Sequence, residues 1–171
     1  MFEPDNLIGR VTEPPDVLFG PARFEVAIVL PRQRLMNDEW RDTARRRAEA
    51  QNIQDLIEPF HPPEDLTRQE VIDLISPHAE VKKQKYRARG VSTADLDLLL
   101  YVNQNVALNV ETPNPNCEAL VRQGWRSVSL IIPPHSYVVL ADNTAPEFIS
   151  GSVEKPTAAW NRPGLCGLFD I

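Results

Sequence analysis

The sequence predicts an α/β (α+β) domain in which a mixed central β-sheet is flanked by helices. Residues 24–30 and 96–102 are almost continuously apolar, which is typical of strands buried on both faces. The chain between them carries the spacing and capping signals of helices. Strands and helices in this order pack as layers around one core. We therefore expect a single domain over residues 1–171, a length that one folding unit commonly has.

The composition excludes several classes of protein. Charged residues make up 25% and hydrophobic residues 42% of the chain, ordinary values that argue against a disordered or fibrous protein. No apolar run approaches the ~20 residues needed to span a bilayer. The acidic, proline-broken N-terminus does not resemble a signal peptide. The two cysteines, Cys117 and Cys166, are far apart and are interpreted as reduced thiols, so we expect a cytoplasmic protein with no membrane partner.

The N-terminal part of the chain predicts an extended lead-in and two strands. Residues 1–15 are polar and rich in proline. Residues 17–19 are a short strand, and the Gly-Pro pair within residues 20–23 indicates a turn. The strand over residues 24–30 follows and ends at Pro31.

A first helix is expected after Asn37, a suitable N-cap followed by two acidic residues in the first turn. Every fourth residue is then apolar, which predicts one face turned toward the core. These residues are Trp40, Ala44 and Ala48. The helix runs on, or restarts at Asn52, and ends before Pro59.

Two further helices are expected before the second buried strand. The capping-box pattern of residues 67–70 predicts a short helix that ends at Ile75. Pro77 then favours a new helix start, because proline suits the first helical position. That helix runs to Arg89 and stops at Gly90, a residue type common just after a helix.

The C-terminal half adds strands and ends in loops. The strand over residues 96–102 is expected to form a hairpin with residues 106–110 through an asparagine-rich turn. Residues 125–132 alternate apolar and polar, which predicts a strand with one solvated face. Residues 137–141 form another strand, and residues 143–171 are expected to be a loop-rich C-terminal segment.

The net charge of −6 conceals a marked asymmetry along the chain. Residues 32–47 hold six Arg against three acids, and residues 82–89 hold five basic residues and no acid. The rest of the chain has 7 basic and 21 acidic residues. A solvated helix face is the usual reason for one basic run, whereas two basic helices on one face would indicate a DNA-binding surface.

Two acidic residues near the N-terminus form a candidate metal site. If residues 20–23 form a four-residue turn, Phe19 pairs with Phe24 and Asp16 falls opposite Ala27. Glu25 then lies on the same face as a diagonal neighbour of Asp16. Two such carboxylates can share Mg²⁺ or Mn²⁺, which would polarise a phosphoryl oxygen and activate a water. The alternative is that Glu25 faces solvent and Asp16 only caps a turn.

Several stretches resemble an uncharacterised bacterial family described as "putative endonuclease". They occur in the same order and span most of the chain. They are residues 14–19 (PPDVLF), 22–26 (ARFEV), 37–41 (NDEWR), 95–99 (DLDLL) and 123–127 (QGWRS). Pro15-Asp16, an apolar strand and Glu25-x-Ala27 also resemble the core of PD-(D/E)xK nucleases, which implies a restriction-endonuclease-like core.

The nuclease resemblance implies a role for each residue of the motif. Asp16 and Glu25 would bind the metal, and a lysine would orient the attacking water and stabilise the developing charge. Ala27 stands where the motif has that lysine. Some members of the wider group carry the lysine on a neighbouring helix, and Lys82 is the candidate here.

The helical spacing around Lys82 predicts that it points inward. Ala79, Lys82 and Tyr86 fall on one face of the expected helix, and the apolar members should turn that face toward the sheet. The alternative is that Lys82 extends along its apolar stem to water, as most lysines on such faces do.

A second departure from the nuclease pattern lies before Asp16. The nuclease fold places a helix before the first strand, often with an acidic residue facing the metal. Only fifteen residues precede Asp16 here, and they are rich in proline. We expect either that the start lies further upstream or that the helix is lost; Glu3 and Glu13 are poor substitutes for its acidic residue.

The remaining chemically interesting residues have default structural explanations. None of them has metal-ligand or nucleophile spacing, and no glycine-rich phosphate loop occurs. They are His61, His78 and His135, the two cysteines, the tryptophans Trp40, Trp125 and Trp160 as packing residues, and Asp95 and Asp97 as cap or strand-edge residues.

Two functions therefore stand at this point. The first is a metal-dependent endonuclease that hydrolyses DNA, with catalytic residues Asp16, Glu25 and Lys82 and with Mg²⁺ or Mn²⁺ on the two acids. The second is a catalytically inactive protein of the same fold that binds nucleic acid or a protein partner through residues 45–47 and 82–89. The oligomeric state is left open.

Overall fold

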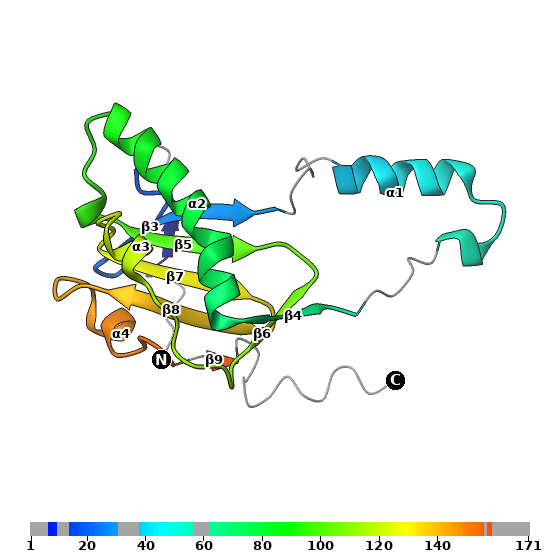
Figure 1. Ribbon diagram of the computed structural model, residues 1–171. Helices are drawn as coiled ribbons and strands as arrows, with labels where there is room; N and C mark the ends of the chain where they lie inside the picture. Colours follow the sequence, from blue (N-terminus) through cyan, green and yellow to red (C-terminus); the bar gives the residue numbers. More distant parts are fainter. Residues whose placement is uncertain (1–6, 10–13, 31–37, 57–61, 156, 159–171) are drawn as a thin grey trace.

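A seven-stranded mixed sheet forms the centre of the protein in a computed structural model that describes residues 7–9, 14–30, 38–56, 62–155 and 157–158 (Figure 1). The strand order is β1-β2-β3-β5-β7-β8-β9, with parallel pairs β3–β5 and β5–β7 in the middle and antiparallel pairs outside them. The strands are β1 (Leu7–Gly9), β2 (Val17–Phe19), β3 (Ala22–Val29), β4 (Glu64–Thr67), β5 (Asp97–Val102), β6 (Val106–Asn109), β7 (Ser127–Ile132), β8 (His135–Ala141) and β9 (Thr157–Ala158). The helices are α1 (Asp38–Glu49), α2 (Arg68–Ala88), α3 (Glu118–Val121) and α4 (Glu147–Ser150), with 3₁₀ turns η2 (Ile53–Leu56) and η3 (Thr93–Asp95). The predicted α+β class with a mixed sheet and flanking helices is confirmed.

The core lies between α2 and one face of the sheet. Leu98 and Leu100 of β5 and Leu130 of β7 are fully buried on this face. Five residues of α2 are buried against them: Val71, Ile72, Ile75, Ala79 and Tyr86. Each large aliphatic side chain removed from water in this way stabilises the fold by about 1.5–3 kcal/mol.

The hairpin between β2 and β3 is tighter than predicted. Phe19 pairs with Ala22 and Val17 pairs with Phe24, so the turn consists of residues 20 and 21 alone. The predicted four-residue turn, with Phe19 opposite Phe24, is therefore wrong. Gly20 has φ +53°, the left-handed backbone that two-residue hairpin turns require.

The helix α2 is one continuous element, and the predicted break at Pro77 is wrong. The predicted capping box is confirmed, because Thr67 and Glu70 exchange side-chain to backbone hydrogen bonds. Pro77 lies inside the helix, where it has no N–H to donate to the carbonyl four residues earlier, and the Ser76 hydroxyl next to it donates to the Ile72 carbonyl at 2.6 Å. The predicted stop at Gly90 is confirmed by its φ of +71°.

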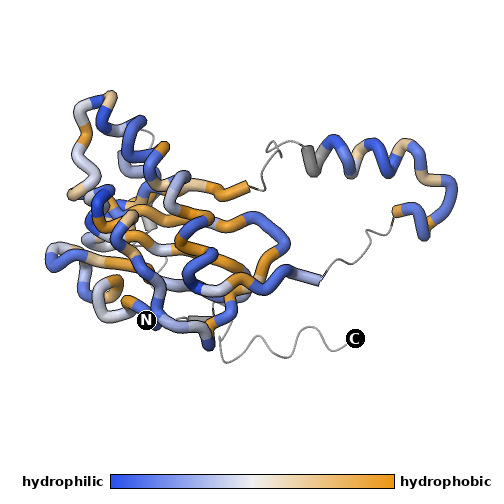
Figure 2. Tube along the Cα trace, in the orientation of Figure 1, coloured by the Kyte–Doolittle hydropathy of each residue, from blue (hydrophilic) through white to orange (hydrophobic). Residues whose placement is uncertain are grey.

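The helix α1 lies where it was predicted in sequence but does not join the core. Figure 1 shows α1 and η2 standing away from the sheet, and Figure 2 shows α1 as mostly hydrophilic. Ala44 and Ala48 are exposed, so the predicted core face is wrong. Alanine offers little apolar area to bury, which explains why this spacing does not hold the helix against the sheet. The side chain of Trp40 lies outside the described residues.

Two other expectations fail because of contacts between distant parts of the chain. The strand β6 pairs in parallel with β4 in a separate two-stranded sheet and does not form a hairpin with β5. The predicted solvated face of β7 is wrong, because Ser127 and Ser129 are buried. In the segment predicted to be loop-rich, the described residues contain the short elements α4 and β9. No helix in the described ranges is long and apolar enough to cross a membrane.

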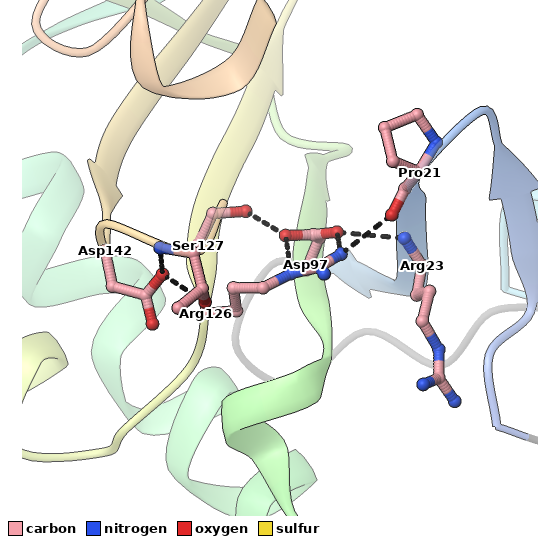
Figure 3. A network of polar contacts seen from close by, with 7 residues as sticks. Pro21, Arg23, Asp97, Arg126, Ser127 and Asp142 are labelled. Atoms are coloured by element: carbon pink, nitrogen blue, oxygen red, sulfur yellow. Dashed lines mark hydrogen bonds and ion pairs between the residues drawn. The ribbon is translucent and has the colours of Figure 1, made fainter. Parts of the chain in front are cut away.

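A buried carboxylate, Asp97, joins the three central strands at one end of the sheet (Figure 3). Arg126 donates from Nε to Oδ1 at 3.0 Å and from Nη2 to Oδ2. Ser127 Oγ donates to Oδ1 at 2.7 Å, and the Arg23 backbone N–H donates to Oδ2 at 2.9 Å. The default role of Asp97 as a simple cap or strand-edge residue is therefore wrong, since it connects β3, β5 and β7. Asp95 is exposed at the end of η3.

Arg126, the electrostatic partner of Asp97, keeps its positive charge at all ordinary pH values. The hydrogen bonds to Asp97 raise the pKa of Arg126 against an opposing effect of burial. A raised folded-state pKa means that the contribution of Arg126 to stability is complete below its unfolded pKa and is lost only at still higher pH. Because the Arg126 guanidinium stays charged throughout the neutral range, its side of the ion pair adds no pH dependence to stability there.

We predict that Arg126→Met lowers the free energy of unfolding by about 3–5 kcal/mol, because it leaves the charge of Asp97 buried and uncompensated. Urea denaturation measures the loss. Arg122→Met is the matched control, since Arg122 is exposed and its change should stay within about 0.5 kcal/mol. Equal losses in the two variants would contradict a structural role for the Asp97 network.

Candidate active site

The three residues proposed from the sequence meet at two neighbouring residues of β3. Asp16 accepts a hydrogen bond from the Val26 backbone N–H at 2.8 Å through Oδ2. Lys82 donates from Nζ to Glu25 Oε1 at 2.5 Å and to the Val26 carbonyl at 3.0 Å. The structure thus places one side chain from the β2–β3 hairpin, one from β3 and one from α2 in contact with the same short segment. The expectation that Lys82 points toward the sheet is confirmed.

The end of β2 explains why these side chains gather here. Pairing between β2 and β3 begins at Val17 and Phe24, so β3 extends beyond its neighbour. Along β3, the backbone N–H and C=O groups of every second residue point toward β2. Val26 is the first of these residues that has no partner residue in β2. Asp16 instead accepts a hydrogen bond from the Val26 N–H, and Lys82 donates one to the Val26 carbonyl. One further step of the observed register puts Asp16 opposite Glu25, and the predicted position opposite Ala27 is wrong.

Glu25 is the unusual member of the group because it is a fully buried acid. Its side chain has 0% exposure, whereas the Lys82 side chain retains 22%. Oε1 is paired with Lys82, but Oε2 has no hydrogen-bond partner among the described residues. A buried carboxylate oxygen without a donor costs free energy. Oε2 is therefore a buried carboxylate oxygen whose hydrogen-bonding capacity is unused among the described residues, and the alternative in which Glu25 simply faces solvent is wrong.

Ala27 leaves space where the nuclease motif has a lysine. Residues 25, 27 and 29 of a strand share one face, and α2 lies over that face, so Lys82 approaches from the helix. A methyl group at position 27 leaves space for such an approach. The Lys82 ammonium thereby lies next to Glu25 without a lysine on the strand itself.

The donor set fits a divalent cation that keeps part of its water shell. No cluster of three or more His, Cys, Asp or Glu occurs in the parts of the chain that the structure describes. Mg²⁺ is commonly held by one or two carboxylates, with waters and substrate phosphate oxygens as its other ligands. The unpartnered oxygen of Glu25 beside the half-buried Asp16 meets that requirement.

A groove adjoins this cluster between β3 and α2. Its volume is about 520 Å³, and Lys82 lies in its wall. The apolar residues of this β3–α2 groove are Val26, Ala27, Ile28, Leu30, Pro77 and Val81. Its polar residues are His78, Lys82 and Lys85.

The histidine at position 78, to which sequence reasoning assigned no role, lies in the groove wall. The signal that could have found it is helical spacing, because residues 78, 82 and 85 differ by four and three positions and share one face of α2. His135 lies half-buried in β8, far along the sheet order from β3. His61 lies outside the described residues.

The remaining reactive and aromatic residues support structural explanations. Burial, with a smaller contribution from the charge of Glu154, raises the pKa of the Cys117 thiol, which makes it a weaker nucleophile at neutral pH. Trp125 is buried and packs edge-on against Tyr86, with ring centroids 6.3 Å apart. Cys166 and Trp160 lie outside the described residues.

The two basic segments do not form one surface in this structure. The helix α1, which carries residues 45–47, stands apart from α2, which carries most of residues 82–89 (Figure 1). Of the two basic segments, α2 is the one that brings positive charge to the cluster around Glu25, through Lys82 and Lys85.

The chain matches, over residues 1–159, the family described as "Putative endonuclease, protein of unknown function (DUF1780)". It belongs to this family. The family resemblance predicted from the sequence is therefore confirmed at the level of that description. No curated protein matches the chain.

A similar solved structure is that of a protein of unknown function from Pseudomonas aeruginosa strain PAO1, described as a member of the monooxygenase superfamily. It is 26% identical, with a TM-score of 0.69, over 92% of this chain and 72% of its own length. The likeness extends over nearly the whole of the present fold. The description of that protein names no substrate or cofactor.

We predict that Lys82→Met destabilises the protein by about 3 kcal/mol, because Glu25 loses the one charged partner that the described residues give it while remaining buried. Glu25→Gln in the same chain should recover part of the loss, so a double-mutant cycle measured by urea denaturation should show coupling. The matched control is Lys83→Met, because Lys83 bonds instead to the Arg122 carbonyl at 3.2 Å. Absence of coupling between positions 25 and 82 would contradict the observed ion pair.

Proposed function

We propose that this protein is a metal-dependent endonuclease of the PD-(D/E)xK type that hydrolyses phosphodiester bonds in DNA. The observation that carries the proposal is the buried Glu25, with one oxygen paired to Lys82 and the other unpartnered, beside Asp16. The family description supports an endonuclease. The superfamily name of the similar solved structure points to a different chemistry for that protein, so the proposal rests on the residues of the site itself.

The order of elements also supports the nuclease type. The hairpin β2–β3 carries both acids, α2 then provides the lysine, and β5 returns parallel to β3. Two acids close together at one hairpin and a lysine from a neighbouring helix are what the PD-(D/E)xK resemblance implies for the site. Among the described residues, the strand β1 precedes β2 in the lead-in, so the site as described contains no acid from an N-terminal helix.

The chain's own residues would divide the work of hydrolysis. Asp16 and Glu25 would hold Mg²⁺ or Mn²⁺, which supplies Lewis-acid activation of the phosphoryl group and a more acidic water when bound. Lys82 is held by the Val26 carbonyl and by Glu25, so its ammonium is fixed beside the metal ligands. From that position it would orient the attacking water and stabilise the negative charge that develops on the phosphate oxygens.

The second candidate is a protein of the same fold that binds nucleic acid or a protein partner without cleaving. Ala27 favours this alternative, because the strand lysine of the motif is absent. The close Lys82–Glu25 ion pair favours it as well, since such a pair neutralises a buried acid without any metal. Cleavage separates the two candidates, because only the first predicts it.

We predict that the purified protein nicks or cuts plasmid DNA with Mg²⁺ or Mn²⁺, and that Asp16→Asn, Glu25→Gln and Lys82→Met each lower the rate about 100-fold or more. Gel electrophoresis of the products measures the rate, at a temperature where circular dichroism shows every variant to be folded. Asp73→Asn and Lys83→Met are controls on α2 outside the site and should keep wild-type rates.

Calorimetric titration with Mn²⁺ provides a readout that does not depend on cleavage. Asp16→Asn and Glu25→Gln should weaken Mn²⁺ binding, whereas Asp73→Asn should not. The proposal fails if the wild-type protein cleaves no DNA with either ion, or if it cleaves as fast after both acids are replaced.

A further inference from the structure

We propose that the β3–α2 groove binds the base of an unpaired nucleotide next to the phosphate that is cleaved, so that the substrate is single-stranded or locally unpaired DNA. This inference rests on the proposed function and specifies its substrate class. It starts from an observation that the hydrolytic residues do not explain, which is the apolar groove that opens directly beside them.

The groove has the size and lining of a site for one flat, apolar-faced group. Its volume of about 520 Å³ is within the usual range for small-ligand sites. Two large aliphatic side chains of its lining remain in contact with water: Ile28 is 44% exposed and Val81 is 66% exposed. A nucleobase that entered between β3 and α2 would cover the exposed side chain of Val81.

The polar residues of the groove lie on one side only. His78, Lys82 and Lys85 follow one face of α2, and no carboxylate lines the groove among the described residues. Two lysines beside an apolar wall suit a nucleotide, whose phosphate needs positive charge while its base needs an apolar surface. The same Lys82 bonds to Glu25, so a nucleotide in the groove lies one side chain away from the proposed metal ligands.

An intact duplex does not offer this groove a suitable group. The faces of paired bases are covered by stacking, so only phosphate and groove edges reach the protein surface. A base must leave the stack to fill an apolar pocket, which costs little in a single strand and more in a duplex. The lining therefore favours unpaired over paired nucleotides at this site.

The test measures binding by fluorescence anisotropy with a labelled single-stranded oligonucleotide and with the duplex of the same sequence. Ca²⁺ replaces Mg²⁺, so that binding is followed without cleavage. The single strand should bind at least about tenfold more tightly than the duplex. Val81→Asn should weaken single-strand binding about tenfold, the size of effect expected for loss of one base contact.

Two matched controls separate the groove from the general surface. Val121→Asn changes a similarly exposed valine on α3 outside the groove (62% exposed) and should leave binding unchanged. Lys85→Ala should weaken binding and reduce its salt dependence by the equivalent of about one phosphate contact. Lys83→Ala, outside the groove, should do neither.

The outcomes distinguish this inference from the proposed function. If DNA is cleaved but single strand and duplex bind alike, or if Val81→Asn and Val121→Asn behave alike, the groove inference is overturned and the endonuclease proposal stands. Single-strand binding that depends on Val81, without cleavage by Mg²⁺ or Mn²⁺, supports the groove and overturns the endonuclease. An anilinonaphthalenesulfonate dye that occupies the groove and is not displaced by single-stranded DNA would overturn the inference in favour of an apolar small molecule.

Discussion

The central sheet depends on how it accommodates the carboxylate of Asp97 at the start of its middle strand. Side chains and backbone from both neighbouring strands supply four hydrogen bonds to two oxygens, which leaves Asp97 fully buried and fully satisfied. Removal of any donor would leave an acid in an apolar core, which is a strong constraint on the sequence. The bonds also fix the ends of β3, β5 and β7 relative to one another, and so determine where the residues that follow in β3 emerge.

Glu25 lies two residues beyond Arg23 in β3 and presents the opposite situation. It is as deeply buried as Asp97, but only one of its oxygens has a partner. Glu25 thus keeps one buried oxygen without a partner among the described residues, and this is the atom on which the proposed metal site depends. The early end of β2 adds to this, because it leaves the Val26 peptide to be completed by Asp16 and Lys82, the two residues that a hydrolytic site would need.

The elements that sequence could predict are those with local signals. The apolar runs of β3 and β5, the capping box of α2 and its stop at Gly90 depend on neighbouring residues, and so does the inward direction of Lys82.

The sequence-based predictions that failed concern residues whose partners are distant in sequence. The strand β4 is short and polar, and its pairing with β6 across about forty residues has no local signature. The role of Asp97 could not be predicted because its hydrogen-bond donors are distant in sequence: Arg126 lies 29 positions away and Arg23 lies 74 positions away. The hairpin register could not be predicted because a Gly-Pro pair suits both a two-residue and a four-residue turn. The four-residue turn puts Asp16 opposite Ala27, whereas the observed two-residue turn puts it opposite Glu25.

The central claim is that the free oxygen of Glu25 and the carboxylate of Asp16 hold one divalent cation. A crystal structure of the protein soaked with Mn²⁺, with the ion located by its anomalous scattering, tests this claim most directly. The account predicts one Mn²⁺ at about 2.1 Å from Glu25 Oε2 and from an oxygen of Asp16, with Lys82 still beside it. A fully occupied Mn²⁺ at another site, with Glu25 bonded only to Lys82, would contradict it.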